Sequence, residues 1–197
     1  MGNYDWDSAF KSGEFRHWED NHSSQELATL IAAGLLRKKQ NVLDVGCGGG
    51  TDTIFLAKSG LNTIGVDSSR KALKIAKRRA KSAHVKTDWV LARVFNLPIK
   101  TETIDLATDR GLFHVIEDAD RPNYASELFR VLKRLGSLLI RGASKNSARD
   151  RFNPITAEAI SRFFDEKKFE IGPVVPIQLF SKVGSIDGRI VLLKKIV

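Results

Sequence analysis

The sequence predicts an α/β protein with a doubly wound, mainly parallel sheet of seven strands that ends in an antiparallel C-terminal hairpin. Short apolar segments alternate with amphipathic ones along most of the chain, which is the pattern of repeated β–α units. One apolar segment runs directly into the glycine cluster at residues 46–50, as at the first strand-to-helix turn of an open sheet. Only a short turn separates the last two apolar segments, which we therefore expect to pair in antiparallel fashion.

The expected strands are short apolar segments that end at glycine, proline or acidic residues. Pro173 and Pro176 interrupt the sixth of them. In chain order these strands cover residues 41–45, 62–66, 86–93, 103–108, 137–141, 169–180 and 189–196.

Helices are expected where apolar residues recur every three or four positions. Ser23, with Glu26 three residues later, has the spacing of a capping box before the first helix. Thr156 is the expected N-cap of the last one. The helices cover residues 27–36, 51–59, 69–83, 121–132 and 156–164.

Composition limits the class of protein. The chain has 197 residues, which points to a single domain, here divided into a helical and aromatic cap segment at residues 1–40 and a main part at residues 41–197. Its one cysteine, Cys47, excludes a disulfide framework and fits a reducing compartment. The opening residues lack the pattern of a signal peptide, and no apolar segment approaches the roughly 20 residues needed to cross a bilayer. We therefore expect a cytoplasmic protein with no membrane partner.

The net charge of +9 at pH 7 gives a pI near 9.8. Such a charge is compatible with binding to nucleic acid or to acidic substrates, and composition alone does not choose between these and simple solubility. The most basic segment is the expected helix at residues 69–83, whose charged positions leave an apolar stripe for the core. We interpret it as a solvated face.

Two nucleotide-binding patterns compete at the glycine cluster. The dinucleotide fingerprint G-x-G-x-x-G fails, because its third glycine, counted from Gly46, falls on Thr51. The alternative has an acid two positions before the first glycine, and Asp44 holds that position. A carboxylate there can meet the ammonium of a methionine moiety, whereas it would repel a pyrophosphate. Asp67 follows the second strand, where a carboxylate can accept hydrogen bonds from a ribose diol.

Together these segments resemble the class I (Rossmann-like) S-adenosylmethionine-dependent methyltransferase superfamily, from about residue 41 to the C-terminus. The segment at residues 109–114 resembles the corresponding segment of a subgroup that includes thiopurine and other small-molecule methyltransferases. The segments that carry the resemblance are VLDVGCGGG at 42–50, GVDSS at 65–69, NLP at 96–98, IDL at 104–106, VLKRLG at 131–136 and DRGLFH at 109–114.

The resemblance implies S-adenosylmethionine as the cofactor. By position, the glycine loop borders its methionine end and Asp67 binds the ribose. Ser68 lies beside the adenine, and the backbone of Val94 faces the adenine edge. The N-terminal segment, with Trp18, covers the site. The cofactor-binding residues implied in this way are Asp44, Gly46, Cys47, Gly48, Asp67, Ser68, Val94, Arg110 and Trp18.

Two departures from the family pattern concern the site. Arg93 stands where the family usually has an aspartate, and arginine cannot accept a hydrogen bond from the adenine amino group. Arg134-Leu135-Gly136 replaces the usual Pro-Gly-Gly turn before the fifth strand.

Methyl transfer is an in-line displacement with a neutral leaving group, so positioning and exclusion of water supply most of the catalysis. A thiol acceptor needs little help, whereas an amine or hydroxyl would need a base, and His114 and Asp109 are the candidates. We expect a small-molecule acceptor and no metal, and Cys47 is expected to be a small residue in a tight turn rather than a nucleophile. The alternatives are an RNA-directed methyltransferase that uses the basic surface, a non-catalytic cofactor-binding scaffold and an NAD-dependent oxidoreductase, which Asp44 and Thr51 disfavour.

Overall fold

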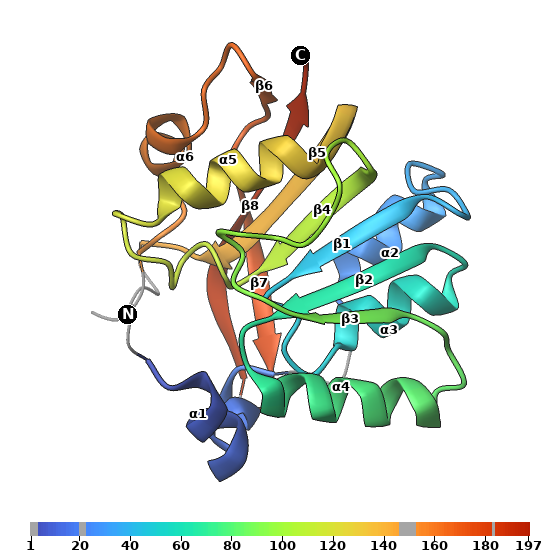
Figure 1. The fold of residues 1–197 in the computed structure, drawn as a ribbon. Helices are drawn as coiled ribbons and strands as arrows, with labels where there is room; N and C mark the ends of the chain where they lie inside the picture. The colour runs from blue at the N-terminus through green and yellow to red at the C-terminus, as the bar shows by residue number, and fades with distance from the viewer. Residues whose placement is uncertain (1–3, 20–22, 146–152, 183) are drawn as a thin grey trace.

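The computed structural model describes residues 4–19, 23–145, 153–182 and 184–197. Its strands are β1 (Asn41–Val45), β2 (Asn62–Asp67), β3 (Asp88–Leu91), β4 (Ile104–Arg110), β5 (Leu132–Ala143), β6 (Phe169–Ile171), β7 (Val175–Ser181) and β8 (Gly184–Lys195). They form one eight-stranded sheet in the order β3-β2-β1-β4-β5-β8-β6, and β7 pairs with β8 beside this path (Figure 1).

Strands β1 to β5 pair in parallel, and β8 pairs antiparallel with β5, β6 and β7. The helices are α1 (Trp6–Ser12), α2 (Gln25–Ala32), α3 (Thr51–Lys58), α4 (Arg70–Ser82), α5 (Arg121–Val131) and α6 (Ala157–Phe163), and a 3-10 helix, η1, spans Glu14–His17. No helix among the described residues is long and apolar enough to cross a membrane.

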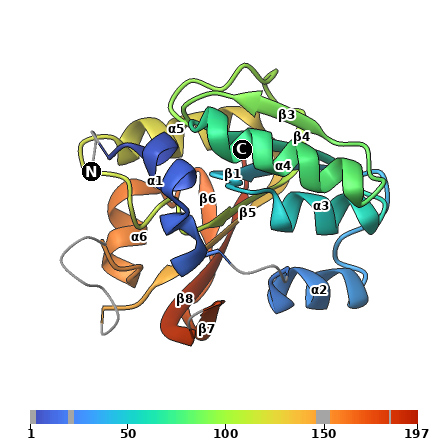
Figure 2. The ribbon, with the colours of Figure 1, turned by 90° about the horizontal axis from the view of Figure 1, so that it is seen from below.

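Helices cover both faces of the sheet, because neighbouring residues of a strand point to opposite faces. In β1, Val42 packs in the cluster that contains Leu27 of α2 and Leu56 of α3. The next residue, Leu43, packs in the cluster that contains Leu128 of α5 and Ile160 of α6. Figure 2 shows α5 and α6 on one side of the sheet and α2 and α3 on the other. This arrangement confirms the predicted doubly wound sheet with its antiparallel C-terminal hairpin.

The strands differ from the predictions at three places. The last strand, β8, begins at Gly184 rather than at residue 189, and residues 184–188 pair with β7. The predicted strand at residues 169–180 is two strands, β6 and β7, and Gly172 and Pro173 lie between them. The predicted strand at residues 137–141 begins at Leu132, directly after α5. The register of β5 against β4 shifts between Ile104 and Leu106, and Leu135 has a φ of 65°. The altered Arg134-Leu135-Gly136 corner is therefore an irregularity within a strand.

The helix predictions hold for α3 to α6 within about two residues, and Thr156 caps α6 as predicted. The capping box of Ser23 with Glu26 was wrong, because the N-cap of α2 is Ser24. The Ser24 side chain makes no cap hydrogen bond and instead accepts one from Arg141. Residues 1–40 were predicted as a helical cap segment, but without bounds for α1 and η1, which lie in it.

The N-terminal segment packs beside α4 (Figure 1). Phe10 and Phe15 form a small apolar cluster with Ala72 of α4. Asp7 accepts hydrogen bonds from the Ser69 hydroxyl (2.5 Å) and from the backbone N–H of Lys71 (3.0 Å). These contacts fix α1 at the N-terminal end of α4, next to the carboxyl ends of β1 and β2.

Candidate active site

The glycine loop joins the end of β1 to the start of α3. Gly46 has a φ of 67°, in the region that favours glycine. Gly49 has no room for a side chain, because a Cβ there would overlap the Glu19 carboxylate and the Arg79 guanidinium. Instead, the N–H of Gly49 donates to Glu19 Oε1 at 2.7 Å, and Glu19 also pairs with Arg79 at 2.9 Å. The loop is thus held to the N-terminal segment and to α4.

Asp67, at the end of β2, connects the glycine loop to α4. Its Oδ2 accepts a hydrogen bond from the N–H of Gly48 at 2.8 Å, and its Oδ1 accepts one from the N–H of Ser69 at 2.8 Å. Burial raises the pKa of the Asp67 carboxyl above its ordinary value, against the opposing effect of these hydrogen bonds. Each oxygen of a carboxylate has further acceptor capacity, so both remain able to receive hydroxyl groups of a ligand.

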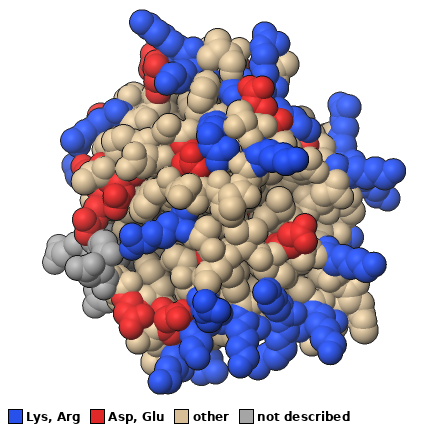
Figure 3. Space-filling view, viewed as in Figure 1, with Lys and Arg blue, Asp and Glu red and all other residues tan. Residues whose placement is uncertain are grey.

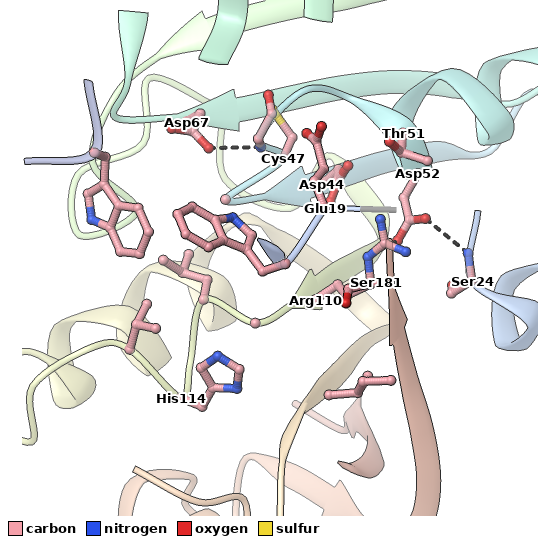
Figure 4. A pocket seen from close by; sticks show the side chains of 18 of the residues that line it. Glu19, Ser24, Asp44, Cys47, Thr51, Asp52, Asp67, Arg110, His114 and Ser181 are labelled. Atoms are coloured by element: carbon pink, nitrogen blue, oxygen red, sulfur yellow. Dashed lines mark hydrogen bonds and ion pairs between the residues drawn. The ribbon is translucent and has the colours of Figure 1, made fainter. Parts of the chain in front are cut away.

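These elements surround a pocket of about 1820 Å³. The N-terminal segment, the carboxyl ends of the parallel strands and the β7–β8 hairpin all contribute to its wall. In Figure 4, Asp67, Cys47 and Asp44 lie along one side, and His114 lies on the opposite side. The structure places every predicted cofactor-binding residue in the lining of this pocket, namely Asp44, Gly46, Cys47, Gly48, Asp67, Ser68, Val94, Arg110 and Trp18.

Asp44 lies at the buried end of the pocket and is only 3% exposed. Thr53 donates a hydrogen bond of 2.6 Å to its Oδ2. Burial, and secondly the nearby carboxylate of Asp52, raise the pKa of Asp44 to about 7. A positively charged ligand group beside Asp44 would favour its ionised form.

Arg141, on β5, is a fully buried cation beneath this end of the pocket. It donates to the Ser24 hydroxyl and to Thr108 Oγ1 (2.5 Å), and it pairs with Asp52 at 3.2 Å. Arg110 approaches the same Asp52 carboxylate at 3.3 Å. One buried network therefore joins β4, β5, α3 and the residue that precedes α2. The sequence analysis missed Arg141 and Asp52, because a lone arginine in a strand carries no recognisable signal.

Asp109, predicted as a general base, does not line the pocket. Its Oδ1 accepts from the N–H of Leu112 (2.7 Å), and its Oδ2 accepts from the N–H of Phe113 (2.9 Å) and from the Tyr124 hydroxyl (2.7 Å). Burial raises its pKa to about 6 despite these hydrogen bonds. The geometry argues against the predicted catalytic role, and Asp109 instead holds the turn after β4 in place.

The raised pKa of Asp109 predicts a pH dependence of stability. A carboxyl whose pKa rises on folding from 3.8 to about 6 stabilises the fold below about pH 4, and this contribution is lost as the pH rises through 6. In Asp109→Asn the group cannot ionise. Between pH 4 and pH 7.5 the free energy of unfolding of the wild type should therefore fall by up to about 3 kcal/mol relative to the variant. Urea denaturation at the two pH values measures this, and a difference that stays constant or changes in the other direction contradicts it.

His114 lines the pocket, but its hydrogen bonding does not suit a base. The backbone N–H of Ala143 donates to His114 Nδ1 at 2.8 Å, so the proton of the neutral ring is on Nε2. Burial, together with the positive charge of Arg121, lowers the pKa of His114 to about 4. At neutral pH this imidazole is therefore uncharged, and neither ring nitrogen is arranged to accept a proton from a substrate.

Cys47 is a thiol in this pocket. Burial and the neighbouring carboxylates of Asp44 and Asp67 raise its pKa well above the ordinary value for cysteine, whereas a nucleophilic cysteine needs a lowered pKa. This agrees with the interpretation of Cys47 as a small residue in a tight turn.

Trp18 forms part of the pocket wall in the N-terminal segment and remains 43% exposed. Trp6 and Phe10 pack edge-on against it, at centroid distances of 6.1 and 6.5 Å. The next residue, Glu19, anchors the segment to the glycine loop. The sequence analysis did not find this role of Glu19, because the residues that it contacts lie thirty or more positions away in the sequence.

The charge of the lining is opposite in sign to that of the whole chain. Among the described residues, the cationic side chains of the lining are Arg93, Arg110 and Lys182. Its eight carboxylic side chains are Glu14, Glu19, Glu26, Asp44, Asp52, Asp67, Glu117 and Asp120. The excess of carboxylates persists when Arg79 and Arg141, which pair with Glu19 and Asp52 from behind the lining, are included.

Comparison with known proteins supports the cofactor pattern. A family model described as a methyltransferase domain matches residues 42–136. The chain is 28% identical over 126 residues to a ubiquinone biosynthesis O-methyltransferase of Pelagibacter ubique, a match that covers 64% of this chain and 51% of that protein. The matches span between about a third and a half of the length of three curated relatives.

Solved structures share the whole fold. A protein described in a study of the conversion of a disulfide bond into a thioacetal group during echinomycin biosynthesis superposes with a TM-score of 0.82 and 21% identity, over 95% of this chain and 91% of that one. The magnesium protoporphyrin IX methyltransferase of Synechocystis PCC 6803, solved with bound S-adenosylmethionine, gives a TM-score of 0.74 and 19% identity over 96% and 94% of the two chains. At these identities the likeness establishes the fold. Residues 42–136 therefore match a methyltransferase domain that contains the cofactor motifs, and the whole chain has the fold of the class I S-adenosylmethionine-dependent methyltransferases.

Proposed function

We propose that this protein transfers the methyl group of S-adenosylmethionine to a small-molecule acceptor. The observation that carries the proposal is the single pocket in which Asp44, the glycine loop and Asp67 meet. Its volume of about 1820 Å³ exceeds the roughly 300–1,000 Å³ of an ordinary ligand site. The pocket therefore has room for a second ligand beside the cofactor.

The residues present fit this cofactor. The Asp67 carboxylate would accept the ribose hydroxyls, and the buried Asp44 would meet the positively charged amino group. Val94 is 6% exposed and would offer its backbone and an apolar surface to the adenine. When bound, the cofactor supplies an electrophilic methyl group on a sulfonium.

The chain then contributes positioning and exclusion of water rather than proton transfer. Asp109 lies outside the lining, and His114 is hydrogen-bonded at Nδ1. Without a base, the site suits an acceptor that ionises near neutral pH, such as a thiol, better than an alcohol or a protonated amine.

The test is formation of S-adenosylhomocysteine from S-adenosylmethionine with benzenethiol, benzylamine and phenol at pH 7.5. We expect benzenethiol to be methylated at least about tenfold faster than phenol or benzylamine, and His114→Ala to retain methylation of the thiol. If the protein binds the cofactor and none of the three acceptors gives product, the non-catalytic scaffold becomes the better account.

A second candidate, an RNA-directed methyltransferase, is favoured by the surface of α4. This helix carries seven Lys and Arg residues and no acid, and Figure 3 shows Lys and Arg gathered along the lower edge of the molecule, where α4 lies in Figure 1. Binding to phosphates weakens steeply with salt. Methylation of RNA at about 0.15 M salt would support this candidate, whereas binding only at low salt without methylation would leave the small-molecule proposal.

A further inference from the structure

The part of the pocket wall that the β7–β8 hairpin forms contains none of the residues predicted to bind the cofactor. We propose that this part binds the acceptor, and that the acceptor is an apolar molecule without phosphate, sulfate or carboxylate groups, whose reacting thiol is its only ionising acidic group. This inference rests on the proposed function, because it names the substrate class of the same site.

The hairpin presents an apolar face to the pocket. Ile177 and Leu179 stand two positions apart on β7, and therefore on one face of the strand. Ile186 of β8 is the register partner of Leu179, and all three residues line the pocket. Opposite Ile177 is Gly188, where a Cβ would lie 2.6 Å from Leu179 Cγ. Because Gly188 has no side chain, the Leu179 side chain can occupy the space beside it.

Three large apolar side chains that line the pocket are exposed to water. They are Trp18 (43% exposed), Phe180 (55%) and Ile186 (43%). Large apolar surface that remains in contact with water inside a concave site marks a place where a ligand gains free energy by covering it. Leu112 and Val115, on the loop after β4, extend the apolar lining.

The charge around the pocket selects against anions. Carboxylates outnumber cationic side chains in the lining, although the chain as a whole carries a net charge of +9. Glu14 of η1, together with Glu117 and Asp120 before α5, adds negative charge from the two segments that flank the apolar wall. A negative potential in a concave, low-dielectric site raises the local concentration of cations and repels anions. Specificity of this kind comes from repulsion as much as from fit.

Two fluorescent probes with the same rings test the proposal directly. N-phenyl-1-naphthylamine is uncharged, and 8-anilinonaphthalene-1-sulfonate is the same molecule with one sulfonate. Titrated into the full chain, with and without saturating S-adenosylhomocysteine, the uncharged probe should bind at least about tenfold more tightly. Tighter or equal binding of the sulfonate, which the overall positive charge would otherwise favour, overturns the proposal.

A matched pair of variants locates the site. Ile186→Ser removes apolar surface from the pocket wall and should weaken binding of N-phenyl-1-naphthylamine about tenfold. Leu192→Ser changes a residue that is equally exposed (43%) on the same strand but does not line the pocket, so it should leave the affinity unchanged. Equal effects of the two variants would contradict the assignment.

Calorimetric titration of S-adenosylhomocysteine separates this inference from the proposed function. Ile186→Ser should bind that ligand as the wild type does, because the hairpin is assigned to the acceptor. If the wild type does not bind S-adenosylhomocysteine, the proposed function is refuted. Unchanged binding of this ligand together with a failed probe experiment would refute only the substrate class.

Discussion

Asp67→Ala is expected to weaken binding of S-adenosylhomocysteine by at least about 100-fold. The carboxylate holds the N–H groups of Gly48 and Ser69 at 2.8 Å each and is the proposed acceptor for two ribose hydroxyls. A hydrogen bond to a charged group contributes about 1.5–3 kcal/mol, and each 1.4 kcal/mol corresponds to a factor of ten in affinity. Loss of both ribose contacts therefore accounts for the expected change.

The matched control is Asp88→Ala. Asp88 is an exposed residue of β3, the strand next to β2, and it does not line the pocket. Asp88→Ala removes the same charge as Asp67→Ala. Because Asp88 lies outside the pocket, the affinity of this variant for S-adenosylhomocysteine should stay within about twofold of the wild type. If Asp67→Ala folds normally and binds the ligand with near wild-type affinity, Asp67 is not the ribose acceptor.

Arg141→Ala is expected to destabilise the fold by about 3–5 kcal/mol, the range for removing one partner of a buried ion pair. Arg141 is fully buried and Asp52 is 3% exposed, so loss of the guanidinium leaves the Asp52 carboxylate with Arg110 as its remaining ion-pair partner. For a chain of this length, a change of that size lowers the melting temperature by roughly 6–20 °C. Thermal unfolding followed by circular dichroism measures it.

Arg162→Ala tests whether burial explains the effect. Arg162 also makes an ion pair, with Asp118 at 3.1 Å, but its side chain is 68% exposed, and exposed pairs contribute little because water screens them. Its melting temperature should stay within about 2 °C of the wild type. A comparable loss in both variants would show that the buried network has no special role.

The parts of the site that the sequence predicted are those encoded by neighbouring residues. Asp44 and the glycine loop lie within one short segment, and Asp67 ends the next strand, so their parallel strands bring them to the same edge of the sheet. The N-cap of α6, Thr156, is a local feature of the same kind.

The parts that could not be predicted depend on contacts between distant segments. Glu19 meets Gly49 thirty positions later, and Arg141 meets Ser24 from the far end of β5. The apolar wall of the acceptor part depends on which face of β7 points inwards. In addition, β7 is a strand separate from β6, because Gly172 and Pro173 lie between the two strands.

The candidate bases show why a residue type near a site does not establish a role. Asp109 lies near the end of β4 and His114 follows that strand closely, as expected for catalytic groups. Their side chains nevertheless accept hydrogen bonds from the backbone N–H groups of Phe113 and Ala143. Only the directions of these hydrogen bonds reveal that the two residues shape the turn and the pocket wall.

The central claim is that the glycine loop and Asp67 form a site for S-adenosylmethionine rather than for a dinucleotide. Isothermal titration calorimetry of the wild type with S-adenosylhomocysteine and, separately, with NAD tests it most directly. The account predicts saturable binding of S-adenosylhomocysteine at micromolar concentration, on the order of −8 kcal/mol, and no measurable binding of NAD. Binding of NAD without binding of S-adenosylhomocysteine would contradict it.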